Sequence, residues 1–206
     1  MKPTTAFSWL LACLLSLASL TAPAAERYLI DTKGAHAFIT FRIQHLGFSW
    51  LEGRFTRFSG DFEYDEANPA NNRVEIRIEM KSLDSDHAER DKHLRGDGYF
   101  DVKKYPTARF VSNAWLDHGD GTATLKGRLT LRGIDKDIEI AVTRMGSGKD
   151  PWGGYRRGFE GSTTLHLSDY RMKKAKLLGP AAEEIRIWLS LEGIRQSRKS
   201  RNPHKR

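Results

Sequence analysis

Cysteine is almost absent from this chain of 206 residues, which contains Cys13 and no other. A single cysteine can form no disulfide within the chain, so the folded state must be stabilised by burial of a core. Internal repeats and low-complexity linkers are also missing. The length is sufficient for one domain with a substantial core. We therefore expect a single domain held together by apolar packing.

Motifs of metal-dependent and nucleophilic enzymes are missing as well. The seven histidines include no His-Glu-x-x-His pair, which is the common zinc-binding arrangement. His87-Ala88-Glu89 matches the start of a zinc deaminase signature, but the Pro-Cys-x-x-Cys partner is absent. Ser112 and Asp169 could be combined with a histidine, yet no Gly-x-Ser-x-Gly elbow occurs. We predict no metal site, no required cofactor and no catalytic constellation.

The N-terminus predicts export. Lys2 precedes an apolar run over 7–20, and small residues follow it. A basic start, an apolar middle and a small-residue cleavage site are typical of a secretory signal peptide. We predict a signal peptide over 1–24, cut after Ala24, and a periplasmic location for the mature protein. The run is shorter than the roughly 20 residues of a membrane span, and too little apolar sequence precedes Cys13 for a lipid anchor.

Most of the remaining sequence alternates between apolar and polar residues with a period of two. The ranges 73–81, 136–145 and 183–194 carry this pattern most clearly. Such alternation is typical of antiparallel strands with one face in water. Turn signals at Gly119-Asp120-Gly121 and Gly133-Ile134-Asp135 predict hairpins. We predict about eight strands, with a ninth or closing strand at the end: 27–31, 35–45, 54–65, 73–81, 107–117, 122–132, 136–145, 156–167 and 183–194.

One short helix near residues 87–95 interrupts the strands. Asp86 and Glu89 form a capping box, and Gly96 supplies a stop. A helix of this length is marginal alone, so we expect it to dock on the sheet. Two side-chain pairs at helical spacing are expected within it, Glu89–His93 and Asp91–Arg95. The residues expected to dock on the sheet are Ala88 and Leu94.

The strands could form either a sandwich or a closed barrel. Gly60, Gly127 and Gly161 occur in the apolar phase of their strands. A glycine in that phase marks a bend or a place where a ligand approaches. Two interpretations stay open: the glycines let a barrel curve, or they leave volume inside it. Both favour a barrel, and eight strands are near the size that holds one small ligand.

The predicted lining constrains the ligand, because few charged side chains fall in the inward phase of the best-patterned strands. A sugar, nucleotide or peptide would leave polar groups unpaired there, at about a few kcal/mol each. A hydrocarbon chain instead gains roughly 0.8 kcal/mol for each buried methylene. The sequence therefore favours a lipid-like guest, or none.

Several motifs along the chain resemble those of the YceI-like family, and the stretch 84–110 is the most characteristic of them. The other motifs are Phe41-Arg-Ile-Gln-His45, Gly53-Arg-Phe55, Phe58-Ser-Gly60 and Gly127-Arg-Leu-Thr130-Leu131-Arg-Gly133. The segment Asp150-Pro151-Trp152-Gly153-Gly154, followed by Gly158-Phe159, resembles the periplasmic proteobacterial branch of the family. The resemblance extends over about residues 28–194. It implies an all-β fold, a lipocalin-like antiparallel barrel over 25–194, with a polyisoprenoid, often a quinone tail, along its axis. No catalytic set comes with it.

On this interpretation the ligand contacts are the inward residues of the predicted strands, namely Phe41, His45, Phe58, Gly60, Phe62, Phe110, Gly127, Leu129, Leu131, Phe159 and Gly161. Arg90, Asp91 and His93 are assigned structural roles, with Asp91 holding the helix and its following loop. His45 either joins Arg90 and His93 in a polar cluster near the barrel mouth or contacts a ligand headgroup, such as a quinone ring oxygen.

Much of the net charge of +8 lies in the basic segment 195–206, which departs from the family pattern. Such runs are usually solvated and disordered; the alternative is contact with anionic lipid head groups. We predict a periplasmic carrier for a polyisoprenoid or isoprenoid quinone, with no nucleic-acid partner, and a homodimer stays open. The alternatives are an isoprenoid- or quinone-linked redox or stress accessory enzyme, and an envelope protein that acts through its basic surface without a ligand.

Overall fold

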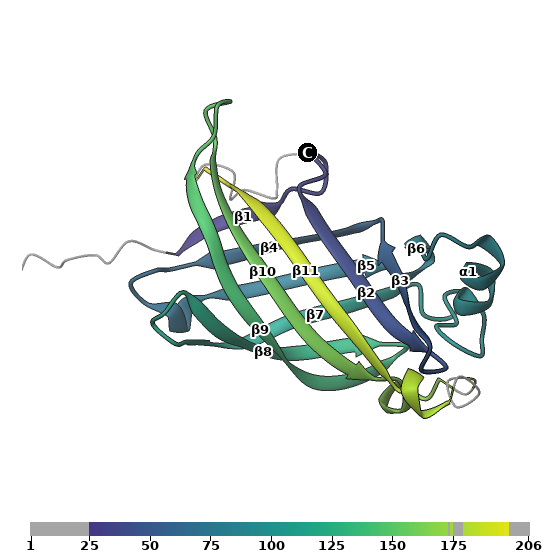
Figure 1. The fold of residues 1–206 in the computed structure, drawn as a ribbon. Coiled ribbons are helices and arrows are strands. Elements are labelled where there is room, and N and C mark those ends of the chain that lie inside the picture. Colours follow the sequence, from purple (N-terminus) through teal and green to yellow (C-terminus); the bar gives the residue numbers. More distant parts are fainter. Residues whose placement is uncertain (1–24, 173, 175–178, 198–206) are drawn as a thin grey trace, which may run out of the picture.

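The computed structural model of the protein describes residues 25–172, 174 and 179–197 (Figure 1). The predicted signal peptide, 1–24, and most of the predicted basic tail lie outside the described residues. None of the helices in the described part is long and apolar enough to cross a membrane.

Antiparallel strands make up most of the described chain. They are β1 (Glu26–Ile30), β2 (Ala37–His45), β3 (Ser49–Phe55), β4 (Phe58–Tyr64), β5 (Arg73–Glu79), β6 (Leu83–Asp84), β7 (Thr107–Asp117), β8 (Thr122–Leu131), β9 (Ile134–Lys149), β10 (Tyr155–His166) and β11 (Glu184–Arg195). One α-helix, α1 (Ala88–Arg95), and short 3-10 segments, η1 (Pro69–Asn71), η2 (Met80–Ser82), η3 (Leu167–Tyr170) and η5 (Pro180–Ala182), complete the described elements.

The sheet closes on itself. Its strands follow the order β1-β4-β5-β7-β8-β9-β10-β11, and β11 pairs again with β1, so the ring contains eight strands. Tyr28 lies opposite Arg195 at the closing pair. Along the other half of β11 the neighbour is β2, with Ile185 opposite Ile43, and β3 and β6 continue outward from β2. The predicted eight-strand antiparallel barrel with one helix is confirmed.

The hairpin turns set the register of the strands. Arg132 and Gly133 both have positive φ, 53° and 70°, as a two-residue turn between twisted strands requires. β9 therefore begins at Ile134, and the turn predicted at 133–135 is one residue too late. A strand over Ser49–Phe55 was not predicted, and the range 54–65 divides into the end of β3 and β4. β11 ends at Arg195, so this residue belongs to the barrel and not to the tail.

The helix begins and docks differently from the prediction. His87 is its N-cap, and the His87 Nδ1 accepts a hydrogen bond of 3.2 Å from the backbone N–H of Arg90. The predicted capping box is wrong, because Asp86 has a φ of 60° and turns the chain before the helix. Ala88 is exposed and does not dock. Leu94 packs against the core, as predicted.

Two side-chain pairs lie along α1. Glu89 pairs with Lys92 at 3.7 Å, one residue before the predicted partner His93, whereas Asp91 and Arg95 lie 3.8 Å apart, as predicted. Gly96 ends the helix with a φ of −72°, so the left-handed freedom of glycine is not used there. The helix lies at one end of the barrel, beside β3 and β6 (Figure 1).

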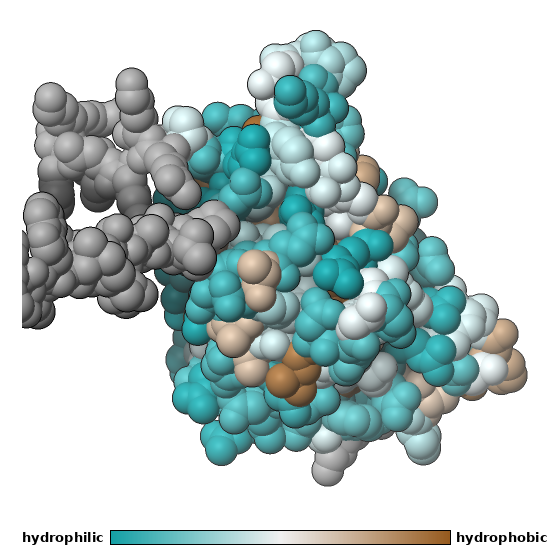
Figure 2. Space-filling view, turned by 90° about the vertical axis from the view of Figure 1, so that its left-hand side faces the viewer, coloured by the Kyte–Doolittle hydropathy of each residue, from teal (hydrophilic) through white to brown (hydrophobic). Residues whose placement is uncertain are grey.

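Alternate residues of the strands fill the barrel with a single apolar core. Its largest fully buried side chains include Tyr28, Ile39, Met80, Leu83 and Tyr170. The outer surface carries ion pairs between neighbouring strands, such as Arg109 with Glu75 at 2.9 Å. Figure 2 shows the face at the left of Figure 1, which is mostly hydrophilic with isolated apolar residues. The period-two pattern of the sequence thus corresponds to an apolar interior and a charged exterior.

Candidate functional site: an apolar cavity in the barrel

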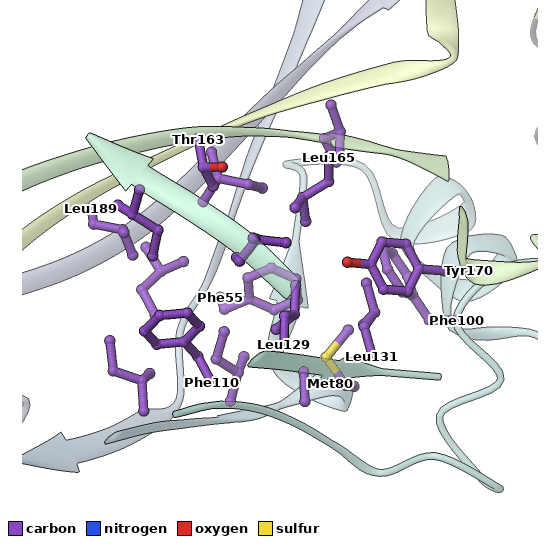
Figure 3. A pocket seen from close by; sticks show the side chains of 18 of the residues that line it. Phe55, Met80, Phe100, Phe110, Leu129, Leu131, Thr163, Leu165, Tyr170 and Leu189 are labelled. Carbon is purple, nitrogen blue, oxygen red and sulfur yellow. The ribbon is translucent and has the colours of Figure 1, made fainter. Parts of the chain in front are cut away.

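The barrel encloses a cavity of about 90 Å³. Strands β2, β3, β5 and β7–β11 contribute its walls, together with η2, η3 and the loop after α1 (Figure 3). Eighteen of its twenty lining side chains are apolar, and only Thr163 and Tyr170 carry a hydroxyl. A water needs roughly 10–15 Å³ and two to four polar partners. This main cavity has the room for water but not the partners, so its chemistry suits hydrocarbon.

The two hydroxyls in the wall differ in their bonding. The Thr163 hydroxyl donates to the backbone carbonyl of Glu139 at 2.7 Å and is therefore satisfied. The Tyr170 hydroxyl points into the cavity (Figure 3) and bonds to no residue in the described part of the chain. Burial, and secondarily the charge of Asp169, raises the pKa of Tyr170 to about 12. Tyr170 is thus a neutral phenol at physiological pH, free to donate to an oxygen of a guest molecule.

A second, smaller interior cavity of about 50 Å³ adjoins the first. Ile76, Phe110, Ile140 and Leu189 line both of them. These four side chains therefore form the partition between the two spaces. The interior can accommodate one extended apolar chain only if this partition opens.

Aromatic rings close the barrel beyond the second cavity. Tyr64, Trp115 and Phe159 contact one another, with ring centroids 5.6–5.9 Å apart. The guanidinium of Arg157 lies 4.2 Å over the Tyr64 ring, and its Nε is buried without a hydrogen-bond partner. Arg157 has a raised pKa and pairs with the exposed Glu66 at 3.5 Å. This inward cation was not predicted, although Arg157 occupies the same phase of the predicted strand 156–167 as Phe159 and Gly161.

Two chain segments cover the opposite end, next to the main cavity. Phe100, from the loop after α1, and Met172, after η3, are both buried and line the cavity. Arg132 ties the segments together, donating to the backbone carbonyls of Asp97 at 3.0 Å and Arg171 at 2.8 Å. We refer to these segments, 96–106 and 167–172, as the end cap. A guest can enter here only when the end cap moves.

The core glycines do not leave open volume in the way the sequence allowed. A Cβ at Gly127 would collide with the ring of Phe110, and a Cβ at Gly60 would collide with the backbone of β5. Gly127 therefore accommodates an aromatic ring of the same core. Gly161 differs, because it lines the second cavity and faces only the side chains of Leu189 and Ile140.

The structure brings six of the predicted ligand contacts to the cavities. Leu129 and Leu131 line the main cavity, Phe62, Phe159 and Gly161 line the second, and Phe110 lines both. The remaining five, Phe41, His45, Phe58, Gly60 and Gly127, line neither.

These five residues have other surroundings. The Phe41 ring packs over Gly53, and its centroid lies 5.7 Å from that of the Phe55 ring, so Phe41 is enclosed by core residues. Phe58 is half-buried against the core, and His45 is exposed at the end of β2. Being in the apolar phase of a strand thus places a residue in the core but not at the cavity.

The predicted cluster of His45, Arg90 and His93 does not form. No hydrogen bond or ion pair joins His45 to either residue in the described chain, and His93 is exposed. Arg90 instead donates through Nε to the Ser85 hydroxyl at 2.8 Å. Asp91 is buried and accepts from the same Ser85, so it holds the helix to the segment before it, not to the following loop.

Sequence reasoning missed the residues that come from irregular segments. Tyr170 and Met172 follow β10 in a region with no periodic signal. Phe100 lies in the aromatic stretch that resembles the family, and this motif could have marked it. The alternating residues Ile185, Ile187 and Leu189 of β11 all line the main cavity and could have been added from their pattern.

A group of potential metal ligands lies outside the barrel interior. Single atoms of Asp31, His36 and Glu192 come within 4.8 Å of one another. Arg156 already neutralises this group: its guanidinium donates to Asp31 at 2.7 Å and also to Glu192. The hydrogen bond from His36 and the contact with Arg156 lower the pKa of Asp31 to about 2. The cluster is therefore an ion-pair network with an arginine in the place of a metal ion.

The comparison with known sequences agrees with this architecture. The profile of the YceI-like domain matches residues 28–193. A UPF0312 protein of Ectopseudomonas mendocina is 50% identical over 172 residues, which is 84% of this chain and 89% of that protein. A UPF0312 protein of Pseudomonas aeruginosa is 52% identical over 172 residues, covering 84% and 88% of the two chains.

Solved structures share the fold at lower identity. BcnA of Burkholderia cenocepacia superposes with a TM-score of 0.71 at 24% identity, over 79% of this chain and 98% of that one. A Campylobacter jejuni YceI protein gives 0.68 at 24% identity, over 75% and 91%. A polyisoprenoid binding domain from Saccharophagus degradans, implicated in plant cell wall breakdown, gives 0.60 at 16% identity, over 82% and 98%.

Proposed function

The chain belongs to the YceI-like family, and on this premise we propose that its barrel binds and carries a polyisoprenoid lipid, with an isoprenoid quinone as the favoured cargo. The observation that carries the proposal is the wall of the main cavity, in which eighteen apolar side chains accompany one hydroxyl, that of Tyr170, with no hydrogen-bond partner among the described residues. The structural neighbour from Saccharophagus degradans is described as a polyisoprenoid binding domain, which supports the same ligand class for this chain.

The energetics favour hydrocarbon over polar guests. A sugar or peptide in the main cavity would meet one free hydroxyl, and its other polar groups would stay unpaired, at about 1–3 kcal/mol each. A hydrocarbon gains roughly 0.8 kcal/mol for each buried methylene. One five-carbon isoprene unit therefore contributes about 3–4 kcal/mol before ordering costs. Repeated units add to this gain wherever the interior can accommodate them.

A long chain needs both cavities. Phe110 lines the two cavities and also lies over Gly127. Its ring is the side chain that has to turn aside when a chain runs along the barrel axis. The cargo then replaces the apolar contacts that the ring gives up, so the partition can open without exposing apolar surface to water.

Tyr170 supplies the polar contact for the headgroup. Its neutral hydroxyl lies at the end-cap side of the main cavity and donates to a quinone carbonyl or to an alcohol. The isoprenoid tail then extends from Tyr170 towards the second cavity. This orientation explains the choice of a quinone over a pure hydrocarbon.

The proposed site of action is the periplasm, as the predicted signal peptide over 1–24 indicates. N-terminal sequencing of the protein from a periplasmic fraction should begin at Ala25 or Glu26. An intact Met1 on protein recovered from the cytosol would contradict this location.

Extraction of the purified protein tests the carrier function. Protein from the periplasmic fraction is extracted with organic solvent, and the extract is analysed by mass spectrometry beside a mock purification from cells without the protein. An isoprenoid in near-stoichiometric amount supports the carrier. Turnover of an added quinone would point to the enzyme alternative, and protein that stays empty after incubation with isoprenoid quinone would refute the proposal.

A further inference from the structure

The hairpin between β2 and β3 exposes large apolar side chains. Leu46 is 51% exposed and Phe48 is 86% exposed, on either side of Gly47 at the tip. Trp50, the next outward residue along β3, is 38% exposed. Exposed apolar groups gathered at one tip mark an interaction surface more often than single exposed residues do.

The backbone of this tip is also unfavourable for its sequence. Leu46 has a φ of 51°, in the left-handed region. Among the non-glycine residues with positive φ in the described chain, Leu46 is the only large aliphatic one; the others are Ala35, Asp86, Asp101, Arg132 and Arg171. Asparagine or glycine would adopt this conformation more easily and would interact better with water. Leu46 is unfavourable here both for the left-handed backbone and for contact with water, which indicates that its side chain has a function.

Arginines stacked on tryptophans lie directly behind the tip. The guanidinium of Arg42 lies 4.5 Å from the Trp50 ring and 4.3 Å from the Trp188 ring. Arg186 lies 5.0 Å from the Trp50 ring. Neither arginine has a carboxylate within ion-pair distance among the described residues, although Glu52 is opposite Arg42 in the strand register. Their charges are therefore available to an anionic partner.

We propose that the β2–β3 hairpin, residues 45–50, docks the protein on an anionic lipid bilayer. Leu46 and Phe48 enter the boundary between head groups and acyl chains, Trp50 stays at the interface, and Arg42 and Arg186 reach the lipid phosphates. Tryptophan is favoured at this level of a membrane because its ring is amphipathic, and arginine is favoured because anionic head groups attract its charge.

The position of the hairpin relates docking to cargo transfer. It lies at the same end of the barrel as η3 and the end cap (Figure 1). Docking there would bring Phe100, Tyr170 and Met172 to the membrane surface, where an isoprenoid resides. This part of the reasoning rests on the proposed carrier function, whereas binding to the bilayer itself does not require a cargo.

The opposite end of the barrel offers a matched control. The β9–β10 hairpin carries Trp152, which is 77% exposed. Its neighbour Arg156, 5.4 Å from the ring, is neutralised by Asp31 and Asp150, each at 2.7 Å. The cation beside this exposed aromatic residue is therefore already paired. Trp152→Ser thus removes a similar apolar group from a surface that the proposal does not use.

Flotation with isoprenoid-free vesicles tests the docking surface. The full chain is mixed with vesicles of phosphatidylethanolamine and phosphatidylglycerol, or of phosphatidylcholine alone. We expect binding to the anionic vesicles that weakens with salt. Phe48→Ser should lower the partition coefficient by about tenfold to a hundredfold, and Arg186→Gln by about fivefold on anionic vesicles only. Trp152→Ser should bind like the wild type.

Leu46→Asn separates docking from folding. Asparagine relieves the left-handed strain, so this variant should melt at a higher temperature than the wild type and yet bind vesicles more weakly. Equal flotation of Leu46→Asn, Phe48→Ser and the wild type would overturn the proposal, as would binding that is lost only when residues 198–206 are deleted. A change of oligomeric state in Phe48→Ser, without a change in flotation, would assign the tip to self-association instead.

The outcome is independent of the extraction experiment. A protein that contains isoprenoid but does not float refutes the docking surface and leaves the carrier function standing. A protein that binds vesicles through the hairpin but never takes up isoprenoid supports the docking surface and refutes the carrier function.

Discussion

Removing the carboxylate of Asp91 should destabilise the end of the barrel that carries the helix. Asp91 is 5% exposed. Its Oδ1 accepts from the backbone N–H of Ser85 at 3.0 Å and from the Ser85 hydroxyl at 2.5 Å. Arg95 lies 3.8 Å from the second oxygen. Asp91→Ala leaves two buried donors without this acceptor and removes the carboxylate that pairs with Arg95.

The magnitude follows from these contacts. A hydrogen bond to a charged group contributes about 1.5–3 kcal/mol, and a buried donor left unsatisfied costs about 1–3 kcal/mol. Since the two donors belong to one residue and water can reach part of the site, we expect the free energy of unfolding to fall by about 2–5 kcal/mol. For a domain of this size each kcal/mol lowers the melting temperature by roughly 2–4 °C. The melting temperature should therefore fall by about 4–20 °C.

Thermal melts and denaturant titrations of three variants test this reasoning. Glu89→Ala is the control on the same helix, because the Glu89 side chain is 68% exposed and its pair with Lys92 is a surface contact. Its effect should stay within about 0.5 kcal/mol. Asp91→Asn keeps an oxygen acceptor for Ser85 and should recover part of the loss. If Asp91→Ala melts like Glu89→Ala, the carboxylate does not hold this end of the barrel and the structural role is refuted.

Three further predictions concern the cavities and the charge network. Gly161→Leu should fill the second cavity, lower the free energy of unfolding by about 1–3 kcal/mol and reduce the isoprenoid recovered by extraction; a folded variant with full ligand would show that the cargo does not reach this cavity. Tyr170→Phe should leave the melting temperature unchanged or higher, because its hydroxyl bonds to no residue in the part of the chain that the structure describes, and should weaken titrated quinone binding about fivefold without affecting an isoprenoid hydrocarbon; equal losses for both ligands would exclude a headgroup contact. The hydrogen bond from His36 and the charge of Arg156 lower the pKa of Asp31 to about 2, so its contribution to stability is complete above about pH 4 and is lost as the pH falls towards 2; melts of Asp31→Asn should show a smaller loss over this window, and parallel curves for the two proteins would contradict the assignment.

The strands that the sequence predicted well are those whose pattern is local. β7 was predicted with its observed bounds, and β5, β8 and β11 within two residues at each end. Their alternation between inner and outer faces follows from strand geometry alone. β3 was missed because Gly53 interrupts its apolar phase, and the ring of Phe41, from the neighbouring strand, fills that place.

The choice between a sandwich and a barrel was not a local matter. It depends on the pairing of β1 with β11, which joins Tyr28 to Arg195 across nearly the whole domain. Strand alternation cannot specify which strands meet at that distance, and the family resemblance supplied this information. The start of the helix shows the same limit: aspartate is a favoured N-cap residue and histidine is not, and only the turn at Asp86 decides that His87 caps.

The sequence by itself determined an apolar interior, a charged exterior and the absence of the common enzyme motifs, because each of these depends on residue type and on a period of two. The tertiary structure decided where the interior stays open. Phe110 covers Gly127, whereas no ring covers Gly161, although both glycines occupy the same phase of their strands. Tyr170 meets the cavity from an irregular segment whose path no periodicity encodes. Cavities are the space that packing leaves unfilled, and packing joins side chains that are far apart in the chain.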